Sequence, residues 1–208
     1  PVIQHATTRA LARGVRTRDA FTAAETVASC GRTPVVMTYW NLIEQYGPDV
    51  FARDLAAAGG AGVITPDLTP DEADEWIAAT ETYGLDRIFL IAPSSTPERI
   101  AMTMAACRGW VYATSVMGVT GVRQGTSQAA PVIVARAREI DPGLPVGVGL
   151  GVGNGEQAAE VGAYADAVIV GSALVRCLAS DGKDMPGDLE RLGTVSAELA
   201  DGVRRSSQ

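Results

Sequence analysis

Three glycine-rich turns offer the most specific chemistry in this sequence. They are Gly118-Val119-Thr120-Gly121, Gly149-Leu150-Gly151 and Gly171-Ser172, and each comes shortly after an apolar run. Glycine lets the backbone approach an anion closely, and consecutive amides can then bind a phosphate without a basic side chain. Tight-turn geometry is the alternative reason for each turn taken alone. Together the three turns predict a phosphate site.

Six apolar runs are predicted to be the strands that position these turns. Most of the runs are continuous, as expected for strands covered on both faces, and they begin about 22 to 35 residues apart. Helical segments between them complete the pattern of a parallel sheet with right-handed crossovers. The runs are Pro34–Tyr39, Gly62–Thr65, Arg87–Ala92, Trp110–Thr114, Pro145–Val148 and Ala167–Val170.

Capping signals and apolar periodicity locate the helices. Helices are predicted over 3–11, 19–30, 49–58, 71–83 and 189–203, and further ones open at Thr96-Pro97 and at Asn154 or Gly155. Two helices therefore precede the first strand. In phosphate-binding barrels the phosphate lies after strands seven and eight. We expect a single (βα)-barrel domain, 1–208, that lacks the first two βα strands and has six strands rather than eight, either incomplete or reclosed.

Composition excludes several classes of function. The net charge of −7 argues against binding to nucleic acid or to anionic membranes. The single histidine, His5, and the widely separated cysteines Cys30, Cys107 and Cys177 predict no metal site and a reducing compartment. No stretch is long and apolar enough for a membrane span. We therefore expect a cytoplasmic protein.

Seven strings, spread from the first residue to the closing helix, carry a family resemblance. They are Pro1-Val-Ile-Gln-His-Ala-Thr, Met37-Thr-Tyr-Trp-Asn41, Thr65-Pro-Asp67, Ala92-Pro-Ser-Ser-Thr96, Gly118-Val-Thr-Gly121, Val146-Gly-Val-Gly-Leu-Gly-Val152 and Val170-Gly-Ser-Ala173. Together they resemble the tryptophan synthase alpha subunit family. The resemblance implies a (β/α)8 barrel that cleaves indole-3-glycerol phosphate to indole and glyceraldehyde 3-phosphate. It also implies a retro-aldol reaction without metal or organic cofactor, and a PLP-dependent beta subunit that receives the indole.

The resemblance assigns roles to individual residues. Thr120 matches the threonine that helps close the site. The Tyr39-Trp40-Asn41 segment and the helix that carries Gln4 flank the surface offered to the beta subunit. The implied phosphate cradle is Gly121, Gly149, Gly151, Gly171 and Ser172, and the implied indole pocket is Tyr39, Asp67, Leu90, Tyr112 and Leu150.

One departure concerns the proton-transfer groups. The resemblance implies a glutamate at the end of the second barrel strand and an aspartate in the next loop, and neither has a counterpart in this sequence. Asp67 is the retained carboxylate at the pocket rim, where the resemblance implies a bond to the indole N–H; a helix-capping role is the alternative. Loss of a general acid or base costs about 10² to 10⁴ in rate. We therefore expect the 208-residue form to be inactive alone.

Three functions are compatible with this sequence. The first is the lyase, the second a non-catalytic homologue that binds a phosphate ligand or regulates, and the third another phosphate-binding barrel such as an isomerase of aminoaldose phosphates. Six strands would leave two open sheet edges, which favour self-association. We expect either a reclosed barrel or a homodimer that exchanges elements.

Overall fold

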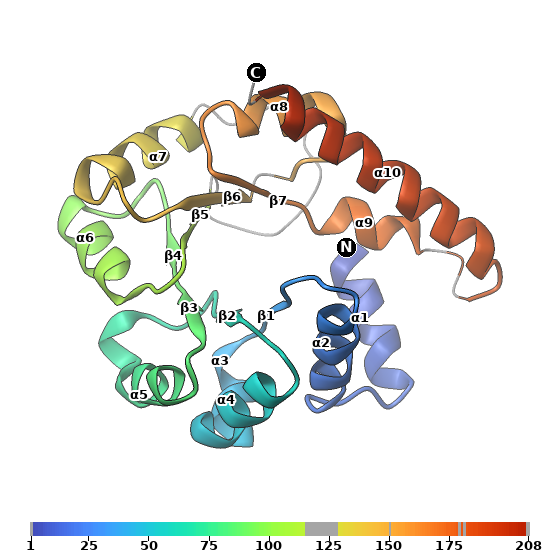
Figure 1. The fold of residues 1–208 in the computed structure, drawn as a ribbon, viewed down its shortest axis with the longest axis horizontal. Coiled ribbons are helices and arrows are strands. Elements are labelled where there is room, and N and C mark those ends of the chain that lie inside the picture. Colours follow the sequence, from blue (N-terminus) through green and yellow to red (C-terminus); the bar gives the residue numbers. More distant parts are fainter. Residues whose placement is uncertain (1, 115–128, 150, 179, 181, 207–208) are drawn as a thin grey trace.

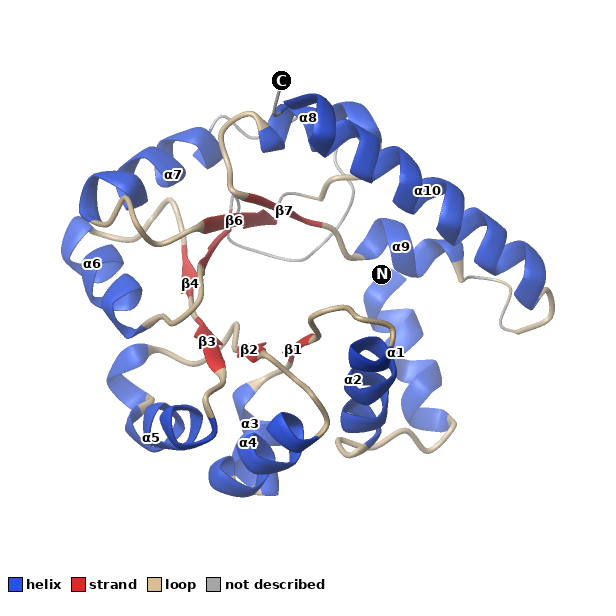
Figure 2. Cartoon of the chain, in the orientation of Figure 1, coloured by secondary structure: helices blue, strands red, loops and turns tan. Residues whose placement is uncertain are grey.

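The strands form one curved, parallel wall. The computed structural model describes residues 2–114, 129–149, 151–178, 180 and 182–206, and the strands within them are ordered β1-β2-β3 and β4-β5-β6-β7. Figure 1 and Figure 2 show this wall curving around an interior, with the helices outside it. The strands are β1 (Val35–Met37), β2 (Gly62–Ile64), β3 (Asp86–Ile88), β4 (Leu90–Ile91), β5 (Val111–Thr114), β6 (Val146–Gly149) and β7 (Ala167–Ile169).

The third predicted run is not one strand. Phe89, which is fully buried, separates β3 from β4, so that β3 pairs with β2 and β4 pairs with β5. The Tyr112 N–H donates to the Phe89 carbonyl over 3.1 Å. The wall therefore continues across the break, and the expected parallel βα architecture is confirmed.

The helices largely follow the predicted signals. Thr96 Oγ1 accepts the Arg99 N–H over 3.2 Å, and Asn154 Oδ1 accepts the Gln157 N–H over 2.9 Å, as expected of N-caps. The helices are α1 (Val2–Ala12), α2 (Asp19–Ser29), α3 (Trp40–Tyr46), α4 (Pro48–Ala57), α5 (Asp74–Tyr83), α6 (Pro97–Ala106), α7 (Ala129–Ile140), α8 (Gly155–Gly162), α9 (Ser172–Cys177) and α10 (Met185–Ser206). The single helix expected over 71–83 is wrong, because a 3₁₀ turn, η1 (Pro70–Glu72), precedes α5.

Strands β1 and β7 are the ends of the wall. Among the described residues β1 pairs only with β2, and β7 only with β6. The described strands therefore do not reclose into a smaller barrel. On β1, Val35 is 36% exposed and Met37 is 52% exposed, whereas Val36 between them packs against an outer cluster. The interior side of this edge strand is thus open to solvent.

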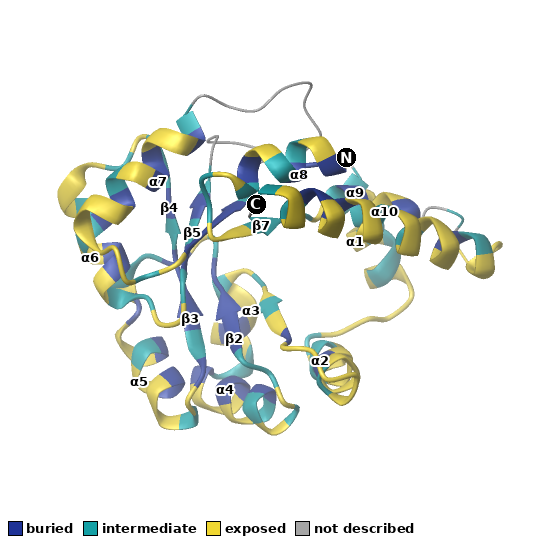
Figure 3. Ribbon diagram, turned by 45° about the horizontal axis from the view of Figure 1, so that its top comes forward, coloured by how far each residue is buried: buried dark blue, intermediate teal, exposed yellow. Residues whose placement is uncertain are grey.

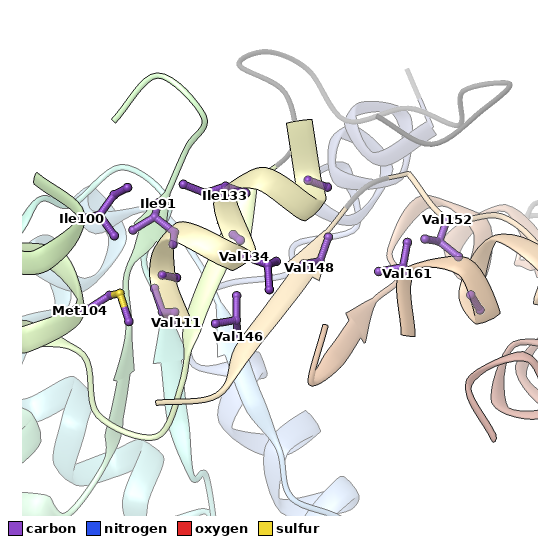
Figure 4. Packing of buried hydrophobic residues seen from close by; sticks show 14 of the residues in the cluster. Ile91, Ile100, Met104, Val111, Ile133, Val134, Val146, Val148, Val152 and Val161 are labelled. Atoms are coloured by element: carbon purple, nitrogen blue, oxygen red, sulfur yellow. The ribbon is translucent and has the colours of Figure 1, made fainter. Parts of the chain in front are cut away.

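Two apolar clusters lie between the wall and its helices. One joins β4–β7 to α6, α7, α8 and α10 and includes Ile91, Ile133 and Val148 (Figure 4). The other joins β2 to α2–α5 and includes Phe51 and Trp76. Figure 3 shows the helices with exposed outer faces and buried faces toward the strands. Burial of this apolar area is the main source of stability.

Helix α10 packs across α8 at very short range. Gly202 of α10 lies against the backbone of Gly155, and the Gly155 N–H donates to Glu198 Oε1 over 2.9 Å. Glycine at 202 is required here because a side chain would overlap the facing carbonyl. This contact closes the first cluster, the one that includes Ile91, Ile133 and Val148, on its outer side.

Membrane insertion through a helix finds no support in the described residues. None of the helices there is long and apolar enough to cross a bilayer.

Candidate functional site

The predicted site residues gather at one end of the wall. Because all the strands run parallel, their carboxyl ends meet at the same edge. Tyr39 follows β1, Asp67 follows β2, Leu90 and Tyr112 belong to β4 and β5, and Gly171 follows β7. Loops at this edge of a parallel barrel are where ligands bind.

Leu90 and Tyr112 lie on the interior face of the wall. They are paired in register, and Tyr112 is paired in turn with Gly147. Their neighbours Ile91, Ala113 and Val148 belong to the outer cluster, so the alternation of side chains turns Leu90 and Tyr112 to the other face. Both are half-buried. The site thus has an aliphatic and an aromatic side chain standing side by side.

The Tyr112 ring packs directly against Gly149. A Cβ at Gly149 would lie 2.5 Å from Tyr112 Cζ and still closer to its hydroxyl, and a Cβ at Gly147 would lie 2.6 Å from the Trp110 ring. The rings of Trp110 and Tyr112 are 6.1 Å apart between centroids and tilted by 33°. Burial raises the pKa of the Tyr112 phenol, which therefore stays neutral and able to donate a hydrogen bond at neutral pH. The glycines make room for an aromatic platform.

Asp67 bonds to the start of a neighbouring helix. Its Oδ1 accepts the backbone N–H of Trp40 over 2.9 Å, and its side chain is exposed at the strand ends. A capping role for Asp67 was the alternative to a pocket role. The structure shows such a role, but for α3 and not for the segment that follows Asp67. Tyr39, 62% exposed, stands beside it.

The described glycine turns differ in how open they are. No atom lies within 4 Å of a Cβ built on Gly171, and Ser172 is the first residue of α9. Gly151 adopts a φ of +70°, in the left-handed region that favours glycine. Exposed amides at a helix start suit an anion. The predicted residues Thr120, Gly121 and Leu150 lie outside the described residues.

Sequence reasoning missed part of the interior face. Met37 and Ile64 are paired in register on β1 and β2, and Ile169 lies on β7 beside Gly149. The sequence carries no signal for Met37, because Val35, Val36 and Met37 are all apolar and only the structure shows that exposure alternates along β1. Thr65, at the end of β2, is buried and its Oγ1 has no hydrogen-bond partner in the described structure.

Other reactive groups lie away from this edge. Burial raises the pKa of the Cys107 thiol to about 11, which disfavours the reactive thiolate. His5 is exposed on α1. Within the described residues no group of histidine, cysteine and carboxylate side chains could hold a metal.

Two surface hollows also lie elsewhere. One of about 480 Å³ lies between α9 and α10, and one of about 660 Å³ lies between α1 and α9; Arg176 borders both. Neither is lined by a residue of the predicted phosphate cradle or indole pocket. The edge formed by the carboxyl ends of the strands is the better candidate for the functional site, because apolar side chains and polar groups lie there together.

Comparisons with known proteins point to one family. A family model described as "Tryptophan synthase alpha chain" matches residues 1–204. Curated proteins of that name from Mycobacterium ulcerans and Acidothermus cellulolyticus are each 60% identical over 205 residues, which is 99% of this chain and 73% and 75% of theirs.

Solved structures agree. A Mycobacterium tuberculosis tryptophan synthase structure matches with a TM-score of 0.90 and 56% identity over 98% of this chain and 75% of that chain. The tryptophan synthase A-subunit of Pyrococcus furiosus matches with a TM-score of 0.84 and 29% identity over 96% and 80%. The chain spans about three quarters of the length of these relatives.

Proposed function

Because the chain belongs to the tryptophan synthase alpha chain family, we propose that it serves the cleavage of indole-3-glycerol phosphate to indole and glyceraldehyde 3-phosphate in tryptophan biosynthesis. Its described residues supply substrate binding in this reaction. One observation carries the proposal. The paired side chains of Leu90 and Tyr112 and the open turn at Gly171 and Ser172 lie at the same end of one parallel sheet.

The indole ring is proposed to lie against the interior wall. Leu90 and Tyr112 offer apolar area to a flat aromatic ring, and ring–ring contacts add about 0.5–1.5 kcal/mol beyond burial. Tyr39 and Asp67 stand at the rim, where a carboxylate oxygen can accept the indole N–H. Leu150 completes the proposed pocket.

The phosphate is proposed to lie on the glycine turns. Gly171 and Ser172 present backbone amides and a hydroxyl at the start of α9, with open space above Gly171. Gly121, Gly149 and Gly151 complete the proposed cradle, and Thr120 helps to close it. Backbone amides give such a site its affinity although the chain is acidic overall.

The described residues at the strand ends offer few groups that could transfer protons. Among the described loops that directly follow strands, Asp67 is the only carboxylate, and one of its oxygens already bonds to Trp40. One group cannot readily act as both general acid and general base. We propose that residues 1–208 by themselves bind the substrate but release indole slowly. The alternative of a non-catalytic homologue is not favoured, because the relatives are named alpha chains.

The test uses the 208-residue chain with indole-3-glycerol phosphate. Calorimetry is expected to show binding that inorganic phosphate weakens by competition, and an indole assay is expected to show turnover far below about one per second, the lower end of ordinary enzymes. Tyr112→Ala should weaken indole more than phosphate, and Gly171→Val should do the reverse. If neither indole-3-glycerol phosphate nor inorganic phosphate binds, the proposed function is wrong. Fast turnover would overturn only the proposal that residues 1–208 release indole slowly.

Two kinds of partner are proposed. A tryptophan synthase beta chain is supported by the family and by neighbours that are tryptophan synthase structures. The exposed interior side of β1, with Val35 and Met37, also favours self-association through the open sheet edges. Sedimentation over a range of concentrations is expected to show dimers. A monodisperse monomer at high concentration would rule self-association out.

A further inference from the structure

Helix α3 has no cap of its own. Tyr39 occupies the N-cap position with an extended backbone, φ −71° and ψ 148°, and its side chain makes no bond to the helix. A helix start leaves backbone N–H groups without partners, and Ser, Thr, Asp or Asn usually satisfies one of them. An aromatic side chain here cannot reach back to do so. The first turn of α3 must therefore find an acceptor elsewhere.

Asp67 supplies that acceptor from 27 residues away. Its Oδ1 lies 2.9 Å from the Trp40 amide nitrogen. Strands β1 and β2 are paired side by side (Figure 1), and this pairing brings the loop after β2 next to the start of α3. The cap thus joins two loops at the strand-end edge.

The rest of α3 is held by its packing. The Trp40 ring meets the Trp76 ring edge to face at 6.1 Å, and Ile43 is fully buried. On the outside, Tyr39 is 62% exposed and Leu42 is 40% exposed. Because the body of the helix is anchored, the Asp67 bond acts chiefly on the exposed first turn, Tyr39–Leu42.

The same carboxylate is available to a ligand. Asp67 is exposed at the edge that carries Leu90 and Tyr112, and within the described structure the Trp40 bond is the only one recorded for it. A carboxylate has two oxygens and about four acceptor sites. One oxygen can therefore cap α3 while the other accepts an N–H from a bound aromatic ring.

We infer that Asp67 is a positioning residue that couples occupancy of the pocket to the exposed turn Tyr39–Leu42. A ligand N–H that bonds to the free oxygen holds the carboxylate against Trp40 and steadies the start of α3. Linkage makes the effect reciprocal, so a partner that orders this turn tightens the ligand by the same factor. The coupling to indole rests on the proposed function, whereas the cap itself does not.

The cap is tested first, on the full 208-residue chain without ligand. Hydrogen exchange of the Trp40 amide, followed by NMR, is expected to be about fivefold faster in Asp67→Ala, the usual effect of a lost cap. Asp67→Asn keeps an acceptor and should exchange at nearly the original rate. Asp71→Ala is the matched control, because Asp71 is an exposed carboxylate paired with Arg99. Equal exchange rates in Asp67→Ala and the original chain would overturn the inference.

The coupling is tested with two probes of the same shape. Indole should slow exchange of the Trp40 amide, and benzofuran, which has an oxygen in place of the N–H, should not. In Asp67→Ala indole should have no effect on this amide. If benzofuran slows exchange as much as indole, the N–H contact is not the cause and the coupling is wrong. If indole does not bind at all, the proposed indole site fails with the coupling, while the ligand-free comparison still decides the cap.

Discussion

Replacing Gly202 by alanine is expected to lower the free energy of unfolding by about 1–3 kcal/mol, the usual cost of overpacking. The new Cβ would lie 2.8 Å from the Gly155 carbonyl carbon and 2.9 Å from its Cα, and closer still to the carbonyl oxygen. These are backbone atoms and cannot rotate away, so α8 and α10 must separate. Thermal unfolding should show a fall in Tm of about 2–12 °C for a chain of this size.

Gly193→Ala on the same helix is the matched control. Nothing lies within 4 Å of a Cβ built there. Alanine in a helix interior is more stable than glycine by about 0.5–1 kcal/mol, so this variant should be slightly stabilised. If both variants lose stability equally, the close crossing of α8 and α10 is not the reason for glycine at 202.

Replacing Gly149 by alanine is expected to weaken indole binding by about tenfold or more, which corresponds to about 1.4 kcal/mol. The added Cβ would lie 2.6 Å from Tyr112 Cε2 and 2.5 Å from Cζ, which forces the ring to move. The fold should also lose about 1–3 kcal/mol through overpacking. Calorimetry with indole and urea unfolding measure the two effects.

A double-mutant cycle identifies the cause. In a Tyr112→Ala background, Gly149→Ala should cost little further stability, with a coupling of about 0.5–3 kcal/mol between the two sites. Gly171→Ala is the control for stability, because its Cβ meets nothing within 4 Å and should change stability by less than about 0.5 kcal/mol. Additive effects of the Gly149 and Tyr112 variants would contradict the platform described for these residues.

Local signals predicted much of the fold. The caps at Thr96 and Asn154 lie within three residues of the amides that they accept, so local signals placed one helix start at Thr96 and the other at Asn154 or Gly155. The apolar runs likewise predict the parallel βα order, because strands covered on both faces have no polar side. These features depend only on neighbours in the chain.

Features that depend on distant residues were missed. Helix α3 has no local capping signal, since its acceptor is Asp67, 27 residues further along. The break at Phe89 separates pairing to β2 from pairing to β5, and neither partner is visible in the run itself. The six-residue helix α9 was also missed, because it is too short to show periodicity.

In the candidate site, too, features that depend on distant residues were missed. The sequence placed Leu90 and Tyr112 in two consecutive apolar runs, and the resemblance assigned them to one pocket. The sequence could not tell that Gly149 lies under the Tyr112 ring, because that contact depends on the register between β5 and β6. Glycine at 149 therefore has a packing reason that is independent of phosphate.

The placement of the three tryptophans has an optical consequence. Trp76 is fully buried and packs against Trp40 in the outer cluster, whereas half-buried Trp110 stands next to Tyr112 on the inner wall. The fluorescence of a tryptophan side chain depends on local polarity and on nearby quenchers. Emission from Trp110 can therefore follow what enters the interior, while emission from the other pair follows the integrity of the outer layer. Single-tryptophan versions of this chain would separate the two signals.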